Sequence, residues 1–249
     1  MSDILVTMNY ALIRSELEVL LKGDISTDKQ ELEQRSIDWS LFKIMPDMIV
    51  YPKHPSDIQK LVSYVNDWNS NHKEKLTITA RAAGSGMSGG SLNHSIILDV
   101  TRYLNHFKEI VPGDFGSQTH RGNFSFPIIG KATAEPGMMY IPFEEKTLAQ
   151  GMIMPTFPAS RKLCALGGMV ANNGAGEKSL KYGQNKDFVS QLKVILSDGN
   201  EYTLKPLSYS ELQDLISEKS YLSQIAMEMY TLVKNNWNLI QSKKPITTK

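Results

Sequence analysis

Arg81-Ala82-Ala83-Gly84-Ser85-Gly86-Met87-Ser88-Gly89-Gly90 is the stretch of this 249-residue chain that decides its fold. A second run of small residues comes later, as Pro158-Ala159-Ser160 followed by Gly167-Gly168-Met169-Val170-Ala171-Asn172-Asn173-Gly174-Ala175-Gly176. Small side chains leave backbone N–H groups open to the approach of a large anion. Two such loops in one chain predict a single extended ligand that both loops bind, and a dinucleotide has that form.

The residues around the first loop predict that it joins two strands. Residues 76–80 read as a strand that leads into the loop, and residues 95–100 read as a strand that leaves it. Earlier in the chain we expect a helix over residues 10–21, a strand over 48–51, and a second helix with Ser56 as its N-cap. These elements form a strand and helix unit around the loop.

The later part of the chain is richer in strand patterns. The polar stretch from Pro112 to Phe126 is expected to be an exposed hairpin between two of these strands. The elements expected here are strands over 107–111 and 127–134, a helix over 143–150, a hairpin of strands over 191–196 and 201–204, and a last helix over 221–240.

The spacing within the first loop separates it from two well-known phosphate-binding loops. Gly84, Gly86 and Gly89 match G-x-G-x-x-G, but only residues 90–94 separate the match from the next strand, too few for the crossover helix of a Rossmann unit. No Gly-Lys-Ser/Thr ends the run, which excludes a Walker A loop. What remains is an anion-binding nest of backbone N–H groups between two strands.

The composition is that of an ordinary globular protein and excludes several function classes. With 41% hydrophobic residues the chain can bury the core of one large domain or two small lobes. Lys and Arg total 27 against 26 Asp and Glu, so a net charge of +1 predicts no nucleic-acid partner. Cys164 is the single cysteine, which excludes an internal disulfide, and we interpret it as a small buried thiol.

Neither a targeting segment nor a hydrolytic or metal site is evident from the residues. Residues 1–6 lack the features of a signal peptide and no apolar run reaches about 18 residues, so we expect a cytoplasmic protein whose membrane contact, if any, is peripheral at the inner face. The serines of the two loops have no recognisable base partner. The histidines are scattered without metal-ligand spacing: His54, His72, His94, His106 and His120.

The two loops, in this order and spacing, resemble the FAD-binding domain of the vanillyl-alcohol oxidase and p-cresol methylhydroxylase (PCMH) type. Residues 81–90 are similar to the family's Arg-Gly-Ala-Gly-Thr-Gly-Leu-Ser-Gly-Gly loop, residues 158–160 to its Pro-Ser-Ser segment, and residues 165–168 to its Thr-Ile-Gly-Gly turn. Residues 182–183 and 194–199 resemble its Tyr-Gly and Val-Leu-x-Asp-Gly blocks. Within the superfamily the chain looks most like the D-lactate dehydrogenase and glycolate oxidase branch, which includes D-2-hydroxy acid dehydrogenases.

This resemblance implies an α+β fold of two lobes: a small strand and helix lobe, and a larger β-rich lobe with flanking helices. The implied domain is residues 46–204, with the small lobe at about 46–103 and the larger lobe at about 104–204. Residues 1–45 would then be an N-terminal helical extension, and residues 205–249 a C-terminal helical segment that stops before the substrate domain of the family.

The resemblance also implies which residues bind FAD. The histidine that attaches FAD covalently in some members is replaced by Ser85 or a near neighbour, which favours non-covalent FAD. Ala82 stands where the family has Gly, and Ala165 where it has Thr, and both departures predict weaker binding. The implied cofactor-binding residues are Arg81, Ala82, Ala83, Gly84, Ser85, Gly86, Met87, Ser88, Pro158, Ser160, Gly167, Gly168, Asn172 and Gly176.

The implied function is the FAD-binding part of a flavin-dependent oxidoreductase that acts on a small 2-hydroxy acid such as D-lactate, glycolate or D-2-hydroxyglutarate, with an unknown electron acceptor. The family's substrate-binding arginines and catalytic histidine lie in the C-terminal half, so this chain alone is expected to lack the substrate site, and no catalytic residue is assigned. Two alternatives stay open: a non-catalytic flavin-binding module from a shortened reading frame, and an NADPH-dependent cell-wall sugar-nucleotide dehydrogenase of the same superfamily.

Overall fold

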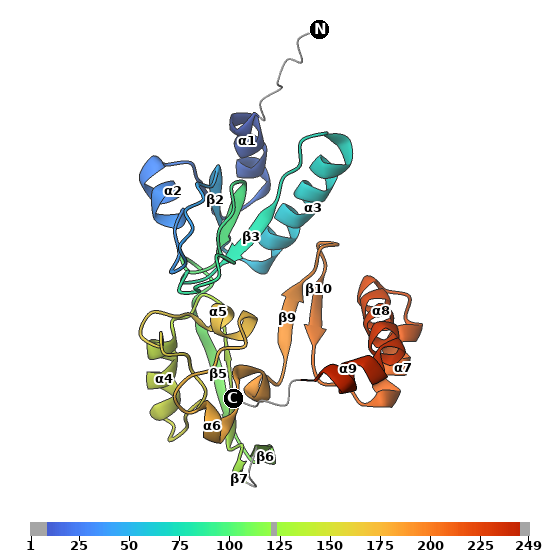
Figure 1. Ribbon diagram of the computed structural model, residues 1–249. Coiled ribbons are helices and arrows are strands. Elements are labelled where there is room, and N and C mark those ends of the chain that lie inside the picture. The colour runs from blue at the N-terminus through green and yellow to red at the C-terminus, as the bar shows by residue number, and fades with distance from the viewer. Residues whose placement is uncertain (1–8, 121–123, 245–249) are drawn as a thin grey trace. The chain divides into compact units, whose positions relative to one another are not determined.

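The chain has a mixed α+β fold, as expected, and divides into two compact units, Met1–Val189 and Ser190–Lys249 (Figure 1). The structure is a computed structural model that describes residues 9–120 and 124–244. The first unit contains both small-residue loops, and the second contains a hairpin and three helices.

A four-stranded sheet with the strand order β1-β2-β4-β3 forms the centre of the small lobe. Strands β2 (Met48–Tyr51), β4 (Ile96–Asp99) and β3 (Ile78–Arg81) run parallel, and β1 (Asp24–Ser26) pairs antiparallel with β2. Sequence analysis missed β1, whose three residues are too few to show an alternating pattern. Its pairing means that the sheet includes a strand from before residue 46.

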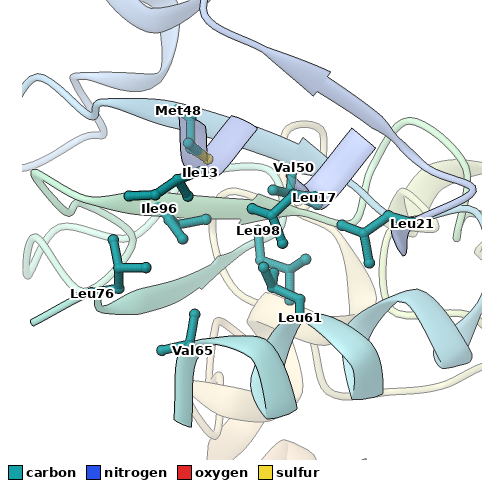
Figure 2. Close-up of a cluster of buried hydrophobic side chains, with 10 residues drawn as sticks. All are labelled: Ile13, Leu17, Leu21, Met48, Val50, Leu61, Val65, Leu76, Ile96 and Leu98. Atoms are coloured by element: carbon teal, nitrogen blue, oxygen red, sulfur yellow. The ribbon is translucent and has the colours of Figure 1, made fainter. Parts of the chain in front are cut away.

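Helices cover both faces of this sheet, which explains why β2 and β4 are buried along their whole length. Helices α1 (Tyr10–Leu20) and α3 (Pro55–Asn71) pack on one face. The cluster drawn in Figure 2 lies there and consists of Ile13, Leu17, Leu21, Met48, Val50, Leu61, Val65, Leu76, Ile96 and Leu98. On the opposite face, Leu32 of α2 (Lys29–Arg35) packs against a cluster formed by Ile49, Tyr51 and Ile97.

The start of α3 differs from the expectation of a Ser56 N-cap, because the helix begins two residues earlier with His54 as its N-cap. Pro55 takes the first helical position, where its fixed φ suits the helix and its missing N–H costs nothing. Asp57 is almost fully buried and accepts hydrogen bonds from the N–H groups of Lys53 at 2.9 Å and Lys22 at 2.9 Å. These bonds tie the helix start to the end of α1.

The larger lobe of the first unit contains two antiparallel strand pairs, β5 (Phe107–Pro112) with β8 (Gly130–Ala134) and β6 (Ser117–His120) with β7 (Phe124–Pro127). The hairpin expected between residues 112 and 126 is confirmed in β6 and β7, and residues 121–123 of it lie outside the described part. The single strand expected over 127–134 is wrong, because residues 128 and 129 bond across to the 113–116 turn and separate β7 from β8.

Short helices and loops complete the larger lobe. They are α4 (Tyr140–Leu148), α5 (Leu166–Ala171), α6 (Ser179–Tyr182) and a 3-10 turn at Asn185–Phe188. Their core consists of Met138, Tyr140, Phe143, Phe157, Cys164 and Met169. Cys164 is 3% exposed, so its interpretation as a buried thiol is confirmed. Helix α4 begins three residues before the expected start, since Tyr140 also belongs to this core.

The second unit consists of the β9 (Leu192–Ile195) and β10 (Glu201–Leu204) hairpin and helices α7 (Tyr209–Ser217), α8 (Tyr221–Asn235) and α9 (Trp237–Lys243). The hairpin is confirmed, whereas the single helix expected over 221–240 is broken at Asn236, and α7 was missed. Within residues 190–244 no large apolar side chain is fully buried. No helix in the described ranges is long and apolar enough to cross a membrane.

Candidate cofactor site

The first loop, residues 81–90, connects the parallel strands β3 and β4 without a helix. Parallel neighbours need a long crossover, which is usually helical, so an irregular connection at this place is unusual. Gly84 has a φ of +66° and Gly89 a φ of +77°, conformations that other residues adopt only at a cost. The strand–loop–strand arrangement expected from the sequence is therefore present.

The backbone amides of this loop have no protein acceptor. Throughout the described residues, no N–H group from Ala82 to Gly90 donates a hydrogen bond to another protein atom. The side chains are also open, since Gly86 and Ser88 are exposed, Met87 is 81% exposed, and Ala82 to Ser85 are half-buried. A run of free and accessible N–H groups is the chemistry that binds a phosphate or pyrophosphate.

Arg81 does not present its guanidinium among these amides. Its side chain is buried beneath the loop, where Nη1 donates to the carbonyl of Arg35 at 3.2 Å and Nη2 to the carbonyl of Ile37 at 2.9 Å. The guanidinium lies against Gly84, because a Cβ added to that glycine would come within 2.2 Å of Nη2. Burial, together with the nearby charge of Arg35, lowers the pKa of Arg81.

The second loop, residues 158–176, is held mainly by its own backbone. Gly167 donates to the carbonyl of Pro136 at 2.7 Å, Cys164 to that of Ser160 at 3.0 Å, and Gly174 to that of Met169 at 2.9 Å. Beneath it, fully buried Asn185 accepts from Thr156 Oγ1 at 3.0 Å and donates to the carbonyl of Met169 at 3.0 Å. This buried pair of polar residues, 29 positions apart in sequence, was not found by sequence analysis because nothing in the chain indicates their pairing.

Most glycines of the second loop are required by the fold, because an added Cβ would collide with neighbouring protein atoms. A Cβ at Gly176 would come within 2.0 Å of the carbonyl oxygen of Phe157, and one at Gly167 within 2.8 Å of the Pro136 ring. A Cβ at Gly174 would lie 2.8 Å from the amide nitrogen of Asn185. These three glycines therefore allow close packing, and the assignment of Gly167 and Gly176 to the cofactor stays a prediction.

Two of the predicted cofactor-binding glycines have space around them, and no close contact within the protein requires a glycine there. Nothing lies within 4 Å of a Cβ added to Gly86, and a Cβ added to Gly168 would meet only Ala82 Cβ, at 3.7 Å. The second contact also shows that the two loops approach one another at Ala82 and Gly168. The structure thus brings together the start of the first loop and the Gly-Gly turn of the second, as a ligand that spans both requires.

The remaining predicted residues of the second loop differ in exposure. Asn172 is exposed at the end of α5, Pro158 and Ser160 are half-buried, and their carbonyls accept bonds from within the loop. Ala165 is buried beside Cys164, whose pKa is raised by burial. The sulfur is therefore poorly placed to react with a cofactor.

A buried ionic cluster behind the second loop was also missed by sequence analysis. Arg161 pairs with Glu144, which is 6% exposed and accepts a hydrogen bond from Tyr140 at 3.2 Å. Burial and the adjacent charge of Glu144 raise the pKa of Tyr140. The guanidinium carbon of Arg161 lies 4.8 Å from the centre of the Phe157 ring. These contacts stabilise the turn after Pro158.

No group of metal-ligating side chains occurs in the described residues.

Comparison with known proteins identifies the class. Residues 46–205 match the family described as FAD binding domain, so the chain belongs to this family, and the resemblance to PCMH-type flavoproteins is confirmed. Solved structures with the same fold include 6-hydroxy-D-nicotine oxidase from Arthrobacter nicotinovorans, at a TM-score of 0.58 and 18% identity over 77% of this chain and 38% of that one. Alkyldihydroxyacetonephosphate synthase matches at a TM-score of 0.62 and 20% identity over 82% and 36%.

Among curated proteins, D-2-hydroxyglutarate dehydrogenase of Escherichia coli is 23% identical over 90% of this chain and 20% of its own length. Glycolate oxidase subunit GlcD of Bacillus subtilis is 24% identical over 64% of this chain and 30% of its own length. The chain thus spans about a fifth to a third of the curated relatives it matches.

The residues present fit an FAD. The free amides of residues 82–90 provide donors for a pyrophosphate, and the open positions at Gly86 and Gly168 are the space that such a ligand needs beside the backbone. Ala82 takes up part of that space, because its methyl group faces Gly168.

Proposed function

We propose that this chain is the FAD-binding part of a flavin-dependent oxidoreductase of the D-2-hydroxy acid dehydrogenase type, with FAD held non-covalently. The observation that carries the proposal is the run of free backbone amides in the first loop, placed against Gly168 of the second. The names of the curated relatives support the reaction class, with a small 2-hydroxy acid as hydride donor.

The residues of the chain contribute binding and position. The amides of residues 82–90 would hold the pyrophosphate, and the self-bonded second loop would keep Gly168 and Asn172 in place beside it. Bound FAD would supply the hydride acceptor, which no side chain can provide. Non-covalent attachment is favoured because the resemblance places Ser85 or a near neighbour where some members carry the covalent histidine, and because the buried Cys164 is poorly placed to react.

Denaturation of the purified chain is expected to release FAD, in an amount that accounts for all of its flavin absorbance. Two loops that meet at one place are needed for a dinucleotide, whereas one nest of amides would suffice for the single phosphate of FMN. The released flavin is identified by chromatography after acid precipitation. Release of FMN, or flavin that stays with the precipitate, would contradict the proposal.

Flavin bound to residues 1–249 is expected not to be reduced by hydroxy acids at an enzymatic rate. Oxidation of such an acid needs a base at its hydroxyl and cations at its carboxylate. In the first loop Arg81 is buried with its donors bound to carbonyls, and in the second loop Arg161 pairs with Glu144. The measurement is anaerobic mixing with D-lactate, glycolate and D-2-hydroxyglutarate while the visible flavin band is followed, with dithionite as positive control. Rapid bleaching by one acid would show that the substrate site lies within this chain.

A further inference from the structure

A short segment before the family domain forms a closed loop. We call it the strap and define it as Ser36–Ile44. Ile37 and Lys43 form an antiparallel bridge, and the N–H of Ile44 donates to the carbonyl of Ser36 at 2.8 Å. Ser36 is fully buried and fixes one end, while Leu41 at the tip is fully exposed. The match to the FAD binding domain begins at residue 46, so the strap lies outside it.

The strap contacts the first loop along its length. The N–H of Trp39 donates to the carbonyl of Gly86 at 3.2 Å, which orients the peptide at the centre of the loop. Ser91 donates its hydroxyl to Asp38 at 3.1 Å, and a Cβ at Gly89 would come within 2.9 Å of the Phe42 ring. These three contacts, from successive parts of the strap, hold the middle and the end of the loop.

Asp38 organises the strap as well as binding the loop. Its second carboxylate oxygen accepts the N–H of Ser40 at 2.8 Å, which fixes the turn before Phe42. Burial raises the pKa of Asp38, but hydrogen bonds from Ser40 and Ser91 and the charge of Arg81 outweigh it, so the pKa lies below its usual range. The side chain is therefore an ionised acceptor at neutral pH.

Arg81 connects the strap to the loop from below. Its two guanidinium bonds go to the carbonyls of Arg35 and Ile37, which flank the start of the strap, and its side chain supports Gly84. Among the described residues no carboxylate forms an ion pair with it, since Asp99 pairs with Arg35 at 2.7 Å instead. Its guanidinium therefore has no direct ionic partner and lies against Gly84 of the loop.

We propose that the strap is part of the cofactor site and that Arg81 is its positioning residue, so that seating of the strap and binding of FAD stabilise one another through the first loop. This inference rests on the proposed function. Arg81 acts through the loop: it holds Gly84 and the strap so that the amides of residues 82–90 face the pyrophosphate together. The coupling free energy is the same in both directions. Bound FAD must therefore stabilise the seated strap by the same factor by which the seated strap increases the affinity for FAD.

Arg81→Met is expected to weaken FAD binding at least about tenfold and to accelerate hydrogen exchange at the Trp39 amide at least about tenfold, because it removes the bond to Ile37 in the strap and the bond to Arg35 just before it. In the unaltered chain, added FAD slows exchange at Trp39, and in Arg81→Met this effect is lost. Arg14→Met is the matched control, since Arg14 lies in the same lobe and bonds to Glu18 and Thr27 instead. It is expected to change neither quantity.

A second pair of variants does not depend on the folding of Arg81→Met. Asp38→Ala removes the acceptors for Ser40 and Ser91 and is expected to weaken FAD binding. Asp38→Asn keeps the oxygen that accepts from Ser40, and its NH2 group can donate to the hydroxyl of Ser91, so it is expected to restore most of the affinity. Such rescue shows that position and not general stability determines the affinity.

Four results decide between the possibilities. Loss of both FAD affinity and Trp39 protection in Arg81→Met supports the proposal. Unchanged Trp39 exchange in this variant would overturn the role of Arg81 in holding the strap, whether or not FAD binds. Faster exchange with FAD affinity within twofold of the unaltered chain would overturn the coupling. An unaltered chain that bound no FAD would overturn the proposed function and the coupling with it. Hydrogen exchange at the Trp39 amide, compared between that chain and Arg81→Met, would still test whether Arg81 holds the strap against the loop.

Discussion

Gly84→Val is expected to raise the dissociation constant for FAD by at least about a hundredfold, which corresponds to roughly 2.8 kcal/mol of binding free energy. Gly84 has a φ of +66°, and a branched side chain in that conformation costs about 1–2 kcal/mol. The added Cβ would also lie 2.2 Å from Arg81 Nη2 and 2.6 Å from its guanidinium carbon. Arg81 must then move and lose its bonds to two carbonyls, worth about 1.5–3 kcal/mol each.

The measurement is a titration with FAD, followed by flavin fluorescence, with a thermal melt of each variant. Gly151→Val is the matched control, because Gly151 has a φ of +70° and nothing lies within 4 Å of its added Cβ. It carries the same backbone strain without the collision, so its FAD affinity should stay within about twofold. Gly84→Val with full affinity after desalting would show that the first loop does not bind the cofactor.

Gly86→Ala tests whether the glycine in this loop is required by the bound ligand or by the fold of the protein. Its Cβ meets no protein atom within 4 Å, so the melting temperature should not fall. If the amides on either side hold a pyrophosphate, the methyl group would hinder its approach and weaken binding about tenfold. A loss of affinity without a loss of stability would therefore locate the ligand at Gly86.

The comparison of the two glycines shows what the sequence could predict and what it could not. Both belong to one motif, and the motif correctly predicted a strand, an irregular loop and a second strand. Only the structure shows that Gly84 is needed for the Arg81 side chain and Gly86 is not. A spacing pattern indicates that small residues are required, but it does not indicate which neighbouring group in the folded protein requires them.

Elements with strong local patterns were predicted well, and those defined by distant partners were not. The apolar spacing of Ile13 and Leu17 and the uninterrupted apolar run of β2 identified α1 and a buried strand. Strand β1 and the strap have no such pattern, because their stability comes from pairing with β2 and from the guanidinium of Arg81. Likewise, buried Glu144 pairs with half-buried Arg161 across 17 positions, which no local rule predicts.

Gly176→Val is expected to have the largest effect on stability, about 3 kcal/mol or more against a total of roughly 5–15 kcal/mol for a typical domain. Its Cβ would lie 2.0 Å from the carbonyl oxygen of Phe157 and 3.2 Å from the carbonyl carbon. A backbone group cannot rotate away as a flexible side chain can. Phe157 is itself 3% exposed in the core of the larger lobe, so relief of the collision must separate the second loop from that core.

Urea unfolding measures this effect, and Gly168→Ala is the matched control within the same loop. Gly168 lies inside α5, where alanine is the better helix former by about 0.5–1 kcal/mol, and its Cβ makes only an ordinary contact with Ala82. Gly168→Ala should therefore unfold no earlier than the unaltered chain, yet bind FAD about tenfold more weakly, because the methyl group narrows the space between the loops. Equal unfolding midpoints for the two variants would contradict the packing role of Gly176. Full FAD affinity in Gly168→Ala would mean that the cofactor does not pass between Ala82 and Gly168, and the meeting of the two loops would then be a contact of the fold alone.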